Sequence, residues 1–334
     1  MTLPPGVVDQ YFAAVTHGNT AAAVGLAVGL ADEGFRLEEL CTELVSHAQI
    51  EVGNRWHRND FSVADEHVAT AVSDTVVSVL TAYSPPPPPG AFRVAVACAE
   101  GEWHALPARL VAEALRAEHF DVTFLGASMP SAHLRRHLDA EAPDVLALSC
   151  STALAFDGVL SCTAVAHELG VPVLAGGRAF GASDRRARVL GADLWCADAA
   201  GAVAHLGRPF PTELAVPTAD VEGATGIESA RGRLVEAATD HLGRTFAPYA
   251  SYNQFQKDRT REDFSHILDF ARASILTRDP TLFDEFLEWL ATLLAARQLP
   301  PAVLELALAA LRDAAEVHAV ASLLRLIDRA VEVP

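Results

Sequence analysis

Hydrophobic residues recur every three or four positions in the first part of the chain, and this spacing is typical of amphipathic helices. The pattern predicts four helices joined by short connections, as in an antiparallel bundle. The expected helices cover residues 6–16, 20–31, 37–57 and 62–83. An N-terminal four-helix bundle is therefore expected over residues 1–83.

A proline run ends this helical pattern. Ser84 is followed by prolines from Pro85 to Pro89 and then by Gly90. Proline lacks a backbone donor and has a fixed φ, so the run can neither continue a helix nor enter a sheet. We expect a semi-rigid polyproline linker over residues 84–90.

The pattern then changes to short β-branched runs that alternate with amphipathic stretches. The runs predict strands at residues 93–98, 122–125, 145–149, 171–175 and 193–196. The stretches between them predict helices at residues 107–118, 131–141, 154–169 and 179–190. This alternation indicates a parallel sheet covered on both faces. A flavodoxin-like, Rossmann-type domain is expected over residues 91–206.

The last part of the chain is helical again. Proline and glycine residues predict a linker over residues 207–227, and the rest predicts a helical domain over residues 228–334. Helices are expected at residues 234–246, 261–276, 281–297, 301–316 and 317–331. The fold class is therefore α/β plus all-α.

Composition narrows the function classes. The formal net charge of −18 disfavours direct nucleic-acid binding, because phosphate backbones would be repelled. Neither a long uncharged apolar run nor a signal-peptide pattern occurs, so we expect a cytoplasmic protein without a membrane partner. The five cysteines are scattered singly in apolar stretches, which indicates reduced, buried thiols.

The loop after the first strand carries the first candidate chemistry. Glu102, Trp103 and His104 follow that strand, and such loops lie at the ligand-binding edge of open α/β sheets. Glu102 could accept one ring N–H of His104, which would leave the other nitrogen for a metal. The alternative is a solvated loop histidine.

Small and hydroxylated residues follow the third and fourth strands at the same edge. Ser149, Ser151 and Thr152 follow one strand, and Gly176 and Gly177 follow the next. A long flat ligand entering between strands needs close backbone approach there. A plain strand-to-helix turn would explain the glycine pair equally well.

The last helix of the expected bundle carries a mixed face. Ser62 is a predicted N-cap with Asp65 three residues on, and Val63, Glu66 and His67 share one face. If that face turns inward, the polar groups need a partner such as an enclosed ligand. The alternative is a solvated outer face.

Trp56 and His57 end the preceding helix, one short turn away. A flat indole and an imidazole at that place could lie over the same site. A lone tryptophan is otherwise a core residue.

Together, Trp56-His57, Val63, Glu66-His67 and Glu102-x-His104 resemble adenosylcobalamin-dependent photoreceptors related to light-sensing repressors of carotenoid synthesis. The resemblance covers about residues 1–205. It implies a base-off adenosylcobalamin with His104 as the lower cobalt ligand. The nucleotide tail would then enter the sheet past Ser149 and the glycine pair.

The same resemblance implies roles on the other side of the corrin. Trp56 would cover the upper axial group, with Val63, Glu66 and His67 around the adenosyl moiety. His57 stands at the position that ligates cobalt from above after light breaks the cobalt–carbon bond.

Two features depart from that family. Pro107 stands where the usual corrinoid loop has glycine, which puts the path of the loop in doubt. We find no pattern for the helix-turn-helix domain that begins the repressors, so direct operator binding is not expected.

The C-terminal helical domain resembles a second sensor type. Its aromatic and basic stretch over residues 249–263, followed by residues 286–290, is similar to the globin-like domain of photocobilins, which pair cobalamin with biliverdin. A bilin needs cations for its propionates and flat or polar groups for its rings. Suitable side chains are Tyr249, Tyr252, Asn253, Lys257, Arg259, Arg261 and His266.

No cysteine follows Cys196, so a bilin in this domain would be held non-covalently. One alternative is an ordinary loop and helix start with a solvated charge run. A haem with His266 or His318 as axial ligand is another.

The resemblance implies a photoreceptor rather than an enzyme. Light would cleave the adenosyl group, His57 would coordinate cobalt, and contacts with other copies or with a downstream effector protein would change. The rival is a corrinoid methyl-shuttle protein of a methyltransferase system, with the C-terminal domain as an interaction module.

Overall fold

A computed structural model describes residues 3–84, 86–208 and 213–332. Pro85 of the first expected linker and residues 209–212 of the second lie outside the described residues. The chain divides into two units, Met1–Pro217 and Thr218–Pro334. The first unit holds the sheet and the N-terminal helices, and the second is helical.

The sheet has five parallel strands in the order β2-β1-β3-β4-β5, which is the flavodoxin-like order expected from the sequence. Its strands are β1 (Arg93–Cys98), β2 (Asp121–Gly126), β3 (Val145–Ser149), β4 (Val173–Gly176) and β5 (Leu194–Cys196). Every residue of β3 is buried, because helices cover both faces of the sheet.

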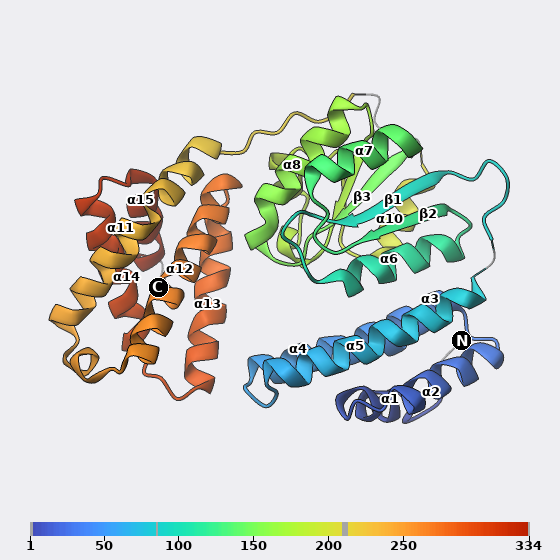
Figure 1. Ribbon diagram of the computed structural model, residues 1–334, viewed down its shortest axis with the longest axis horizontal. Coiled ribbons are helices and arrows are strands. Elements are labelled where there is room, and N and C mark those ends of the chain that lie inside the picture. Colours follow the sequence, from blue (N-terminus) through green and yellow to red (C-terminus); the bar gives the residue numbers. More distant parts are fainter. Residues whose placement is uncertain (1–2, 85, 209–212, 333–334) are drawn as a thin grey trace. The chain divides into compact units, whose positions relative to one another are not determined.

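The helices of this domain lie in two layers. Figure 1 shows α7 (Ser131–Glu141) and α8 (Phe156–Glu168) over one face, and α6 (Ala105–Ala117) and α10 (Ala199–Leu206) over the other. Ala108, Ala112 and Leu115 of α6 pack on Val94 and Val96 of β1 in one buried cluster. Shorter elements are η3 (Ala153–Ala155), η4 (Arg178–Phe180) and α9 (Arg185–Val189).

One predicted helix of this domain is wrong. The sequence predicts a helix over residues 179–190, but the structure forms the 3-10 turn η4 and then the helix α9, which covers only Arg185–Val189. Gly181 interrupts the segment with a φ of 76°, a left-handed conformation that breaks a helix.

The N-terminal region is helical as expected. Its elements are α1 (Val7–Thr16), α2 (Thr20–Asp32), α3 (Leu37–Glu39), η1 (Leu40–Ser46), α4 (His47–His57), α5 (Val63–Leu80) and η2 (Thr81–Tyr83). Tyr11, Leu44, Val45 and Val76 are fully buried in its core. The specific four-helix bundle arrangement remains a prediction.

A π-helical segment interrupts the third predicted helix. Between α3 and α4 the chain forms η1, in which Leu40, Cys41, Leu44 and Val45 are buried. A π-helical turn holds more residues than an α-helical turn, so successive side chains point in different directions. Both Leu40–Cys41 and Leu44–Val45 can therefore reach the core. Helical spacing in the sequence did not reveal this insertion.

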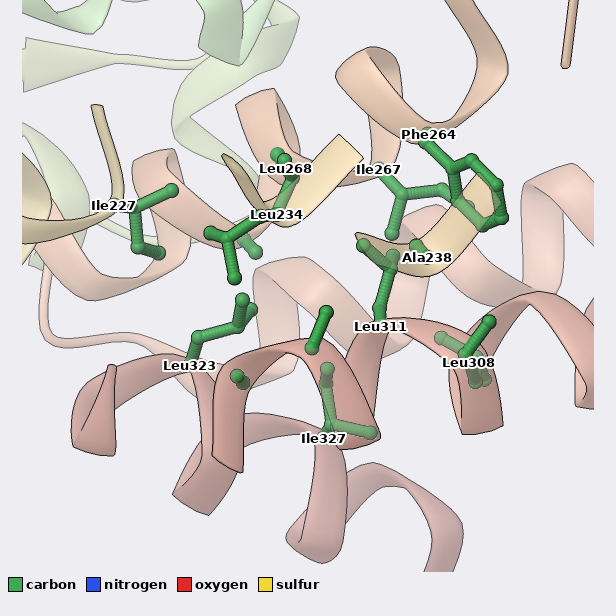
Figure 2. Packing of buried hydrophobic residues seen from close by; sticks show 14 of the residues in the cluster. Ile227, Leu234, Ala238, Phe264, Ile267, Leu268, Leu308, Leu311, Leu323 and Ile327 are labelled. Carbon is green, nitrogen blue, oxygen red and sulfur yellow. The ribbon is translucent and has the colours of Figure 1, made fainter. Parts of the chain in front are cut away.

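The second unit has its own core. Its elements are α11 (Val221–Thr245), η5 (Ala247–Ser251), α12 (Gln254–Leu276), α13 (Pro280–Ala296), α14 (Ala302–Val317) and α15 (Ala321–Glu332). Figure 2 shows Leu323 of α15 pointing toward Leu234 of α11, and Leu311 of α14 pointing toward Ala238, within this core. A helical region is therefore confirmed, and the globin-like arrangement remains a prediction.

The helix α11 begins within the segment 207–227 that the sequence assigns to a linker. Asp220 caps the helix by accepting a hydrogen bond from the Gly223 amide at 2.9 Å. Buried Ala224 and Ile227 then hold the first turns against the core. Packing therefore outweighs the low helix propensity of the glycines.

No helix among residues 3–84, 86–208 and 213–332 is long and apolar enough to cross a membrane.

Candidate functional site

Three loops meet at the carboxyl edge of the sheet. The register pairs Cys98 with Ser149 and Ser149 with Gly176, so β1, β3 and β4 end side by side. The predicted site residues that follow these strands are therefore neighbours. The arrangement follows from the parallel order of the strands.

The loop after β1 is a tight structure that leads into α6. The Ser128 amide donates to the Glu102 carbonyl at 2.7 Å, and the Ser128 hydroxyl accepts from the Gly101 amide at 3.0 Å. Gly101 has a φ of 85°, which favours glycine. His104 then stands at the N-cap of α6, so its backbone is fixed on both sides.

The Glu102 carboxylate is fully buried and joins two of these loops. Its Oε1 accepts from the His104 amide at 2.8 Å and from His104 Nδ1 at 2.6 Å. Its Oε2 accepts from the amides of Ser151 and Thr152 at 2.5 and 3.0 Å. Burial opposes ionisation, but these hydrogen bonds outweigh it and lower the pKa of Glu102.

The His104 ring is held on one side and open on the other. Its side chain is 61% exposed, although Nδ1 contacts the buried carboxylate. A carboxylate only accepts, so Nδ1 carries the proton and Nε2 keeps a lone pair. The hydrogen bond that His104 donates to Glu102 raises the pKa of His104. The expected pairing of Glu102 and His104 is thus present in the structure.

The neighbouring Trp103 is exposed, at 75% of its surface. Leu154, in the turn η3 that follows Thr152, is also exposed, at 44%. These apolar groups leave the edge suited to a flat, mostly apolar ligand.

The glycine pair after β4 has a structural explanation. Gly177 has a φ of 111°, and a Cβ there would lie 2.3 Å from the Cys150 carbonyl oxygen. A Cβ on Gly176 would lie 3.1 Å from Cys196 Sγ. Close packing of the loops therefore requires Gly177 whether or not a ligand approaches.

The mixed face of α5 is not buried. Val63 is 55% exposed and the His67 side chain 73% exposed. Glu66 is half-buried and accepts from Thr70 Oγ1 at 3.0 Å. The Glu66 carboxylate also adds to the raised pKa of His104, so this part of α5 lies within electrostatic reach of the imidazole.

Trp56 and His57 are half-buried at the C-terminal end of α4. The turn that follows is held by Arg55, whose carbonyl accepts from the Asp60 amide at 2.9 Å. The Arg55 guanidinium lies 4.5 Å from the centre of the Phe12 ring and 5.5 Å from that of Phe61. Cation–π contacts of this kind help to fix the turn.

Sequence reasoning missed three residues of this site. Ser128 holds the loop after β1, Arg55 holds the α4–α5 turn, and Arg178 opposes the raised pKa of His104. Only Arg178 had a signal in the sequence, because it directly follows the glycine pair.

In the second unit the predicted bilin residues gather where η5 meets α12. The rings of Tyr249 and Tyr252 are 5.3 Å apart, and Lys257 Nζ lies 5.9 Å from the Tyr249 ring centre. Asn253 caps α12 by accepting from the Gln256 amide. His266 is exposed on the same helix.

The two arginines proposed for bilin propionates already have partners. Arg259 pairs with Glu262 at 2.7 Å, and Arg261 pairs with Asp258 at 3.1 Å. Both pairs lie on the surface of α12, where ion pairs are weak and exchangeable.

Comparison with known protein families identifies the type of domain in the first unit. A family described as B12 binding domain matches residues 92–206, and a second of the same description matches residues 7–81. The chain is therefore a cobalamin-binding protein. No curated protein sequence matches it.

One solved structure supports the fold of this cobalamin-binding region, and two others are similar at a lower score. The monomethylamine corrinoid protein of Methanosarcina barkeri is 20% identical, with a TM-score of 0.53 over 60% of this chain and 96% of that one. A cobalamin-binding protein of Desulfitobacterium hafniense is 18% identical, with a TM-score of 0.33 over 60% of this chain and 97% of that one. A methanol:cobalamin methyltransferase complex of Methanosarcina barkeri is 17% identical, with a TM-score of 0.33 over 62% of this chain and 82% of that one.

The site residues fit a corrinoid. In the part of the chain that the structure describes, no group of three or more His, Cys, Asp or Glu side chains could hold a metal ion. A corrin ring supplies the equatorial nitrogens of its cobalt, so a single oriented imidazole is enough. His104, with its free Nε2, offers that ligand.

Proposed function

We propose that this cobalamin-binding protein is an adenosylcobalamin-dependent photoreceptor and not an enzyme. The observation that carries the cobalt site is the His104 imidazole, which a fully buried carboxylate orients at the sheet edge. Bound adenosylcobalamin would supply a cobalt–carbon bond that light can break.

His104 and Glu102 act together on the lower side. The carboxylate keeps the proton on Nδ1 and so presents the Nε2 lone pair outward. The amides of Ser151 and Thr152 neutralise part of the buried charge. The ring is therefore positioned before the cofactor arrives.

The N-terminal helices supply the upper side in this proposal. Trp56 would cover the bound cofactor on this side, and Val63, Glu66 and His67 would lie near the adenosyl moiety. The electrostatic reach of Glu66 to His104 supports this placement of α5. After illumination, His57 would be the residue on this side that could hold the cobalt.

The signal would be a shift of the N-terminal helices against α6. Ion pairs connect these parts, among them Asp74 with Arg109 at 3.2 Å and Arg36 with Glu118 at 3.7 Å. Partly exposed pairs each stabilise by at most about 1 kcal/mol, so their exchange costs little. The changed surface would alter light-dependent self-association or contact with a downstream effector protein.

The test is an absorption spectrum of the reconstituted chain before and after illumination. We expect a light-driven spectral change together with a change in oligomeric state. His57→Ala should bind the cofactor in the dark and lose the His57-dependent illuminated spectrum, and His104→Ala should retain cobalamin less well. His17→Ala, at the end of α1, is the matched control. A wild-type protein that binds adenosylcobalamin but shows no change in light would contradict the proposal.

A second candidate is a corrinoid methyl carrier of a methyltransferase system. It is favoured by the fold shared with the monomethylamine corrinoid protein. Such a carrier would exchange a methyl group with a partner methyltransferase, and illumination alone would leave its oligomeric state unchanged.

We also propose that the second unit binds biliverdin non-covalently. The support is the aromatic pair Tyr249 and Tyr252 with Lys257 beside it. Binding of the propionates would require Arg259 and Arg261 to exchange their present partners. Biliverdin added to the chain should produce a red-absorbing band, and a spectrum equal to that of free pigment would reject this part.

A further inference from the structure

Arg178 is fixed at the sheet edge by the residues around it. It directly follows Gly177, whose backbone packs against Cys150, and it begins the short turn η4. The next residues, Ala179 and Phe180, are buried, and the Phe180 ring lies 5.7 Å from that of Phe156. The Arg178 backbone therefore has little freedom, although its side chain is exposed.

The Arg178 guanidinium has no hydrogen-bond or ion-pair partner among the described residues. Other arginines of the same segment do have partners. Arg188 pairs with Asp184 at 2.5 Å, and Arg186 donates to the Ala179 carbonyl at 3.3 Å. The Arg178 guanidinium therefore does not hold this loop together through a hydrogen bond or an ion pair to a described residue.

The position of this cation is linked to the cobalamin site. Arg178 follows the end of β4, where Gly176 pairs with Ser149 and Ser149 in turn pairs with Cys98 of β1, so Arg178 and the loop that carries His104 leave the sheet at the same edge. The chain as a whole carries a net charge of −18. An exposed guanidinium at the site therefore provides local attraction for an anion.

The chemistry of the ligand indicates which anion this is. The corrin side chains of cobalamin end in neutral amides, and its anionic group is the phosphodiester that joins the ring to the nucleotide tail. Guanidinium groups bind phosphate oxygens through charge-assisted, often bidentate hydrogen bonds.

We propose that Arg178 recognises this phosphodiester and selects complete cobalamins over corrinoids that lack the nucleotide tail. The inference rests on the proposed cobalamin site. In this proposal Arg178 determines specificity for the nucleotide tail, whereas His104 binds the cobalt.

The test compares two corrinoids on the full chain in the dark. Hydroxocobalamin carries the phosphodiester, and cobinamide lacks both the phosphate and the nucleotide. Absorbance titrations of wild type, Arg178→Gln, Arg178→Lys and Arg188→Gln give the dissociation constants. Arg188→Gln is the matched control, because it removes a nearby arginine whose charge is already paired.

We expect Arg178→Gln to weaken hydroxocobalamin binding about tenfold and cobinamide binding less than about twofold. Arg178→Lys should keep most of the preference, and Arg188→Gln should change neither constant. Added salt should reduce the wild-type preference, because screening weakens an exposed charge contact. Comparing the ratio of the two constants isolates the phosphate contact from other losses.

Equal weakening for both corrinoids, or unchanged selectivity in Arg178→Gln, would overturn the inference while leaving cobalamin binding intact. A wild-type chain that binds neither corrinoid would instead overturn the cobalamin site itself. Melting curves of the variants serve as the folding check, and we expect them to match because the side chain is exposed.

Discussion

The Glu102 carboxylate accepts hydrogen bonds from the amides of His104, Ser151 and Thr152 and from the His104 ring. A buried carboxylate is costly unless its oxygens are satisfied, and here both are. The same group therefore does two things. It joins the loops after β1 and β3, and it sets which ring nitrogen of His104 faces outward.

Replacing Glu102 tests both roles. Glu102→Gln puts an amide donor where an acceptor is needed by either His104 or the Ser151 and Thr152 amides. We expect the free energy of unfolding to fall by about 1–3 kcal/mol, because hydrogen bonds to a charged acceptor are lost. Denaturant melts measure this. An unchanged free energy of unfolding would show that the carboxylate does not hold the loops together.

At the scale of elements, the site loop depends on a helix that contributes no ligand. Gly158 lies in the first turn of α8, and a Cβ there would stand 1.8 Å from the Glu100 carbonyl oxygen. The helix backbone and the loop after β1 are therefore in direct contact. Packing of α8 fixes how far this loop stands from the sheet.

Gly158→Ala should displace the loop and destabilise the fold by roughly 2–4 kcal/mol, because both contacting groups are backbone. Gly29→Ala in α2 is the matched control, since nothing lies within 4 Å of the added Cβ. That change should stabilise the protein by about 0.5–1 kcal/mol through helix propensity. Thermal melts of both variants measure these changes in stability. Equal changes in the two variants would contradict the predicted clash between residue 158 and the Glu100 backbone.

At the scale of the whole first unit, the N-terminal helices meet the sheet domain through α6. Fully buried Glu113 of α6 pairs with Arg116. Its Oε2 has no hydrogen-bond partner within the part of the chain that the structure describes. A partly satisfied charge at this junction costs stability and makes separation of the two parts easier.

Burial raises the pKa of Glu113, although Arg116 and Arg109 act to lower it. The folded protein therefore holds this proton at higher pH than the unfolded chain does, for which the usual value is 4.5. The stability contributed by protonation is fully present below 4.5 and is lost as the pH rises through the folded pKa.

Glu113→Gln removes this titration and keeps an acceptor for Arg116, which is 24% exposed. We expect the variant to be more stable than wild type at neutral pH, and the gain to shrink as the pH is lowered. Urea melts across the pH range measure the difference. A gain that is constant with pH would exclude Glu113 as its source.

The sequence by itself determined much of this protein. Periodicity predicted the helical ends and the parallel sheet, with β1 and β3 at their observed bounds. The sequence also predicted that Glu102 and His104 lie together, because residues two positions apart in a short loop are necessarily close in space. These features follow from the spacing of residues along a single segment of the chain, so no knowledge of distant segments is needed to predict them.

Only the tertiary structure decided the rest. The bonds from Glu102 to Ser151 and Thr152, the backbone contact of Gly158 with Glu100, and the field of Arg178 at His104 each join residues far apart in sequence. Packing also started α11 at Val221 despite its glycines. Such contacts depend on strand register and on how loops stack at the sheet edge, and no local pattern of residue types encodes those distances.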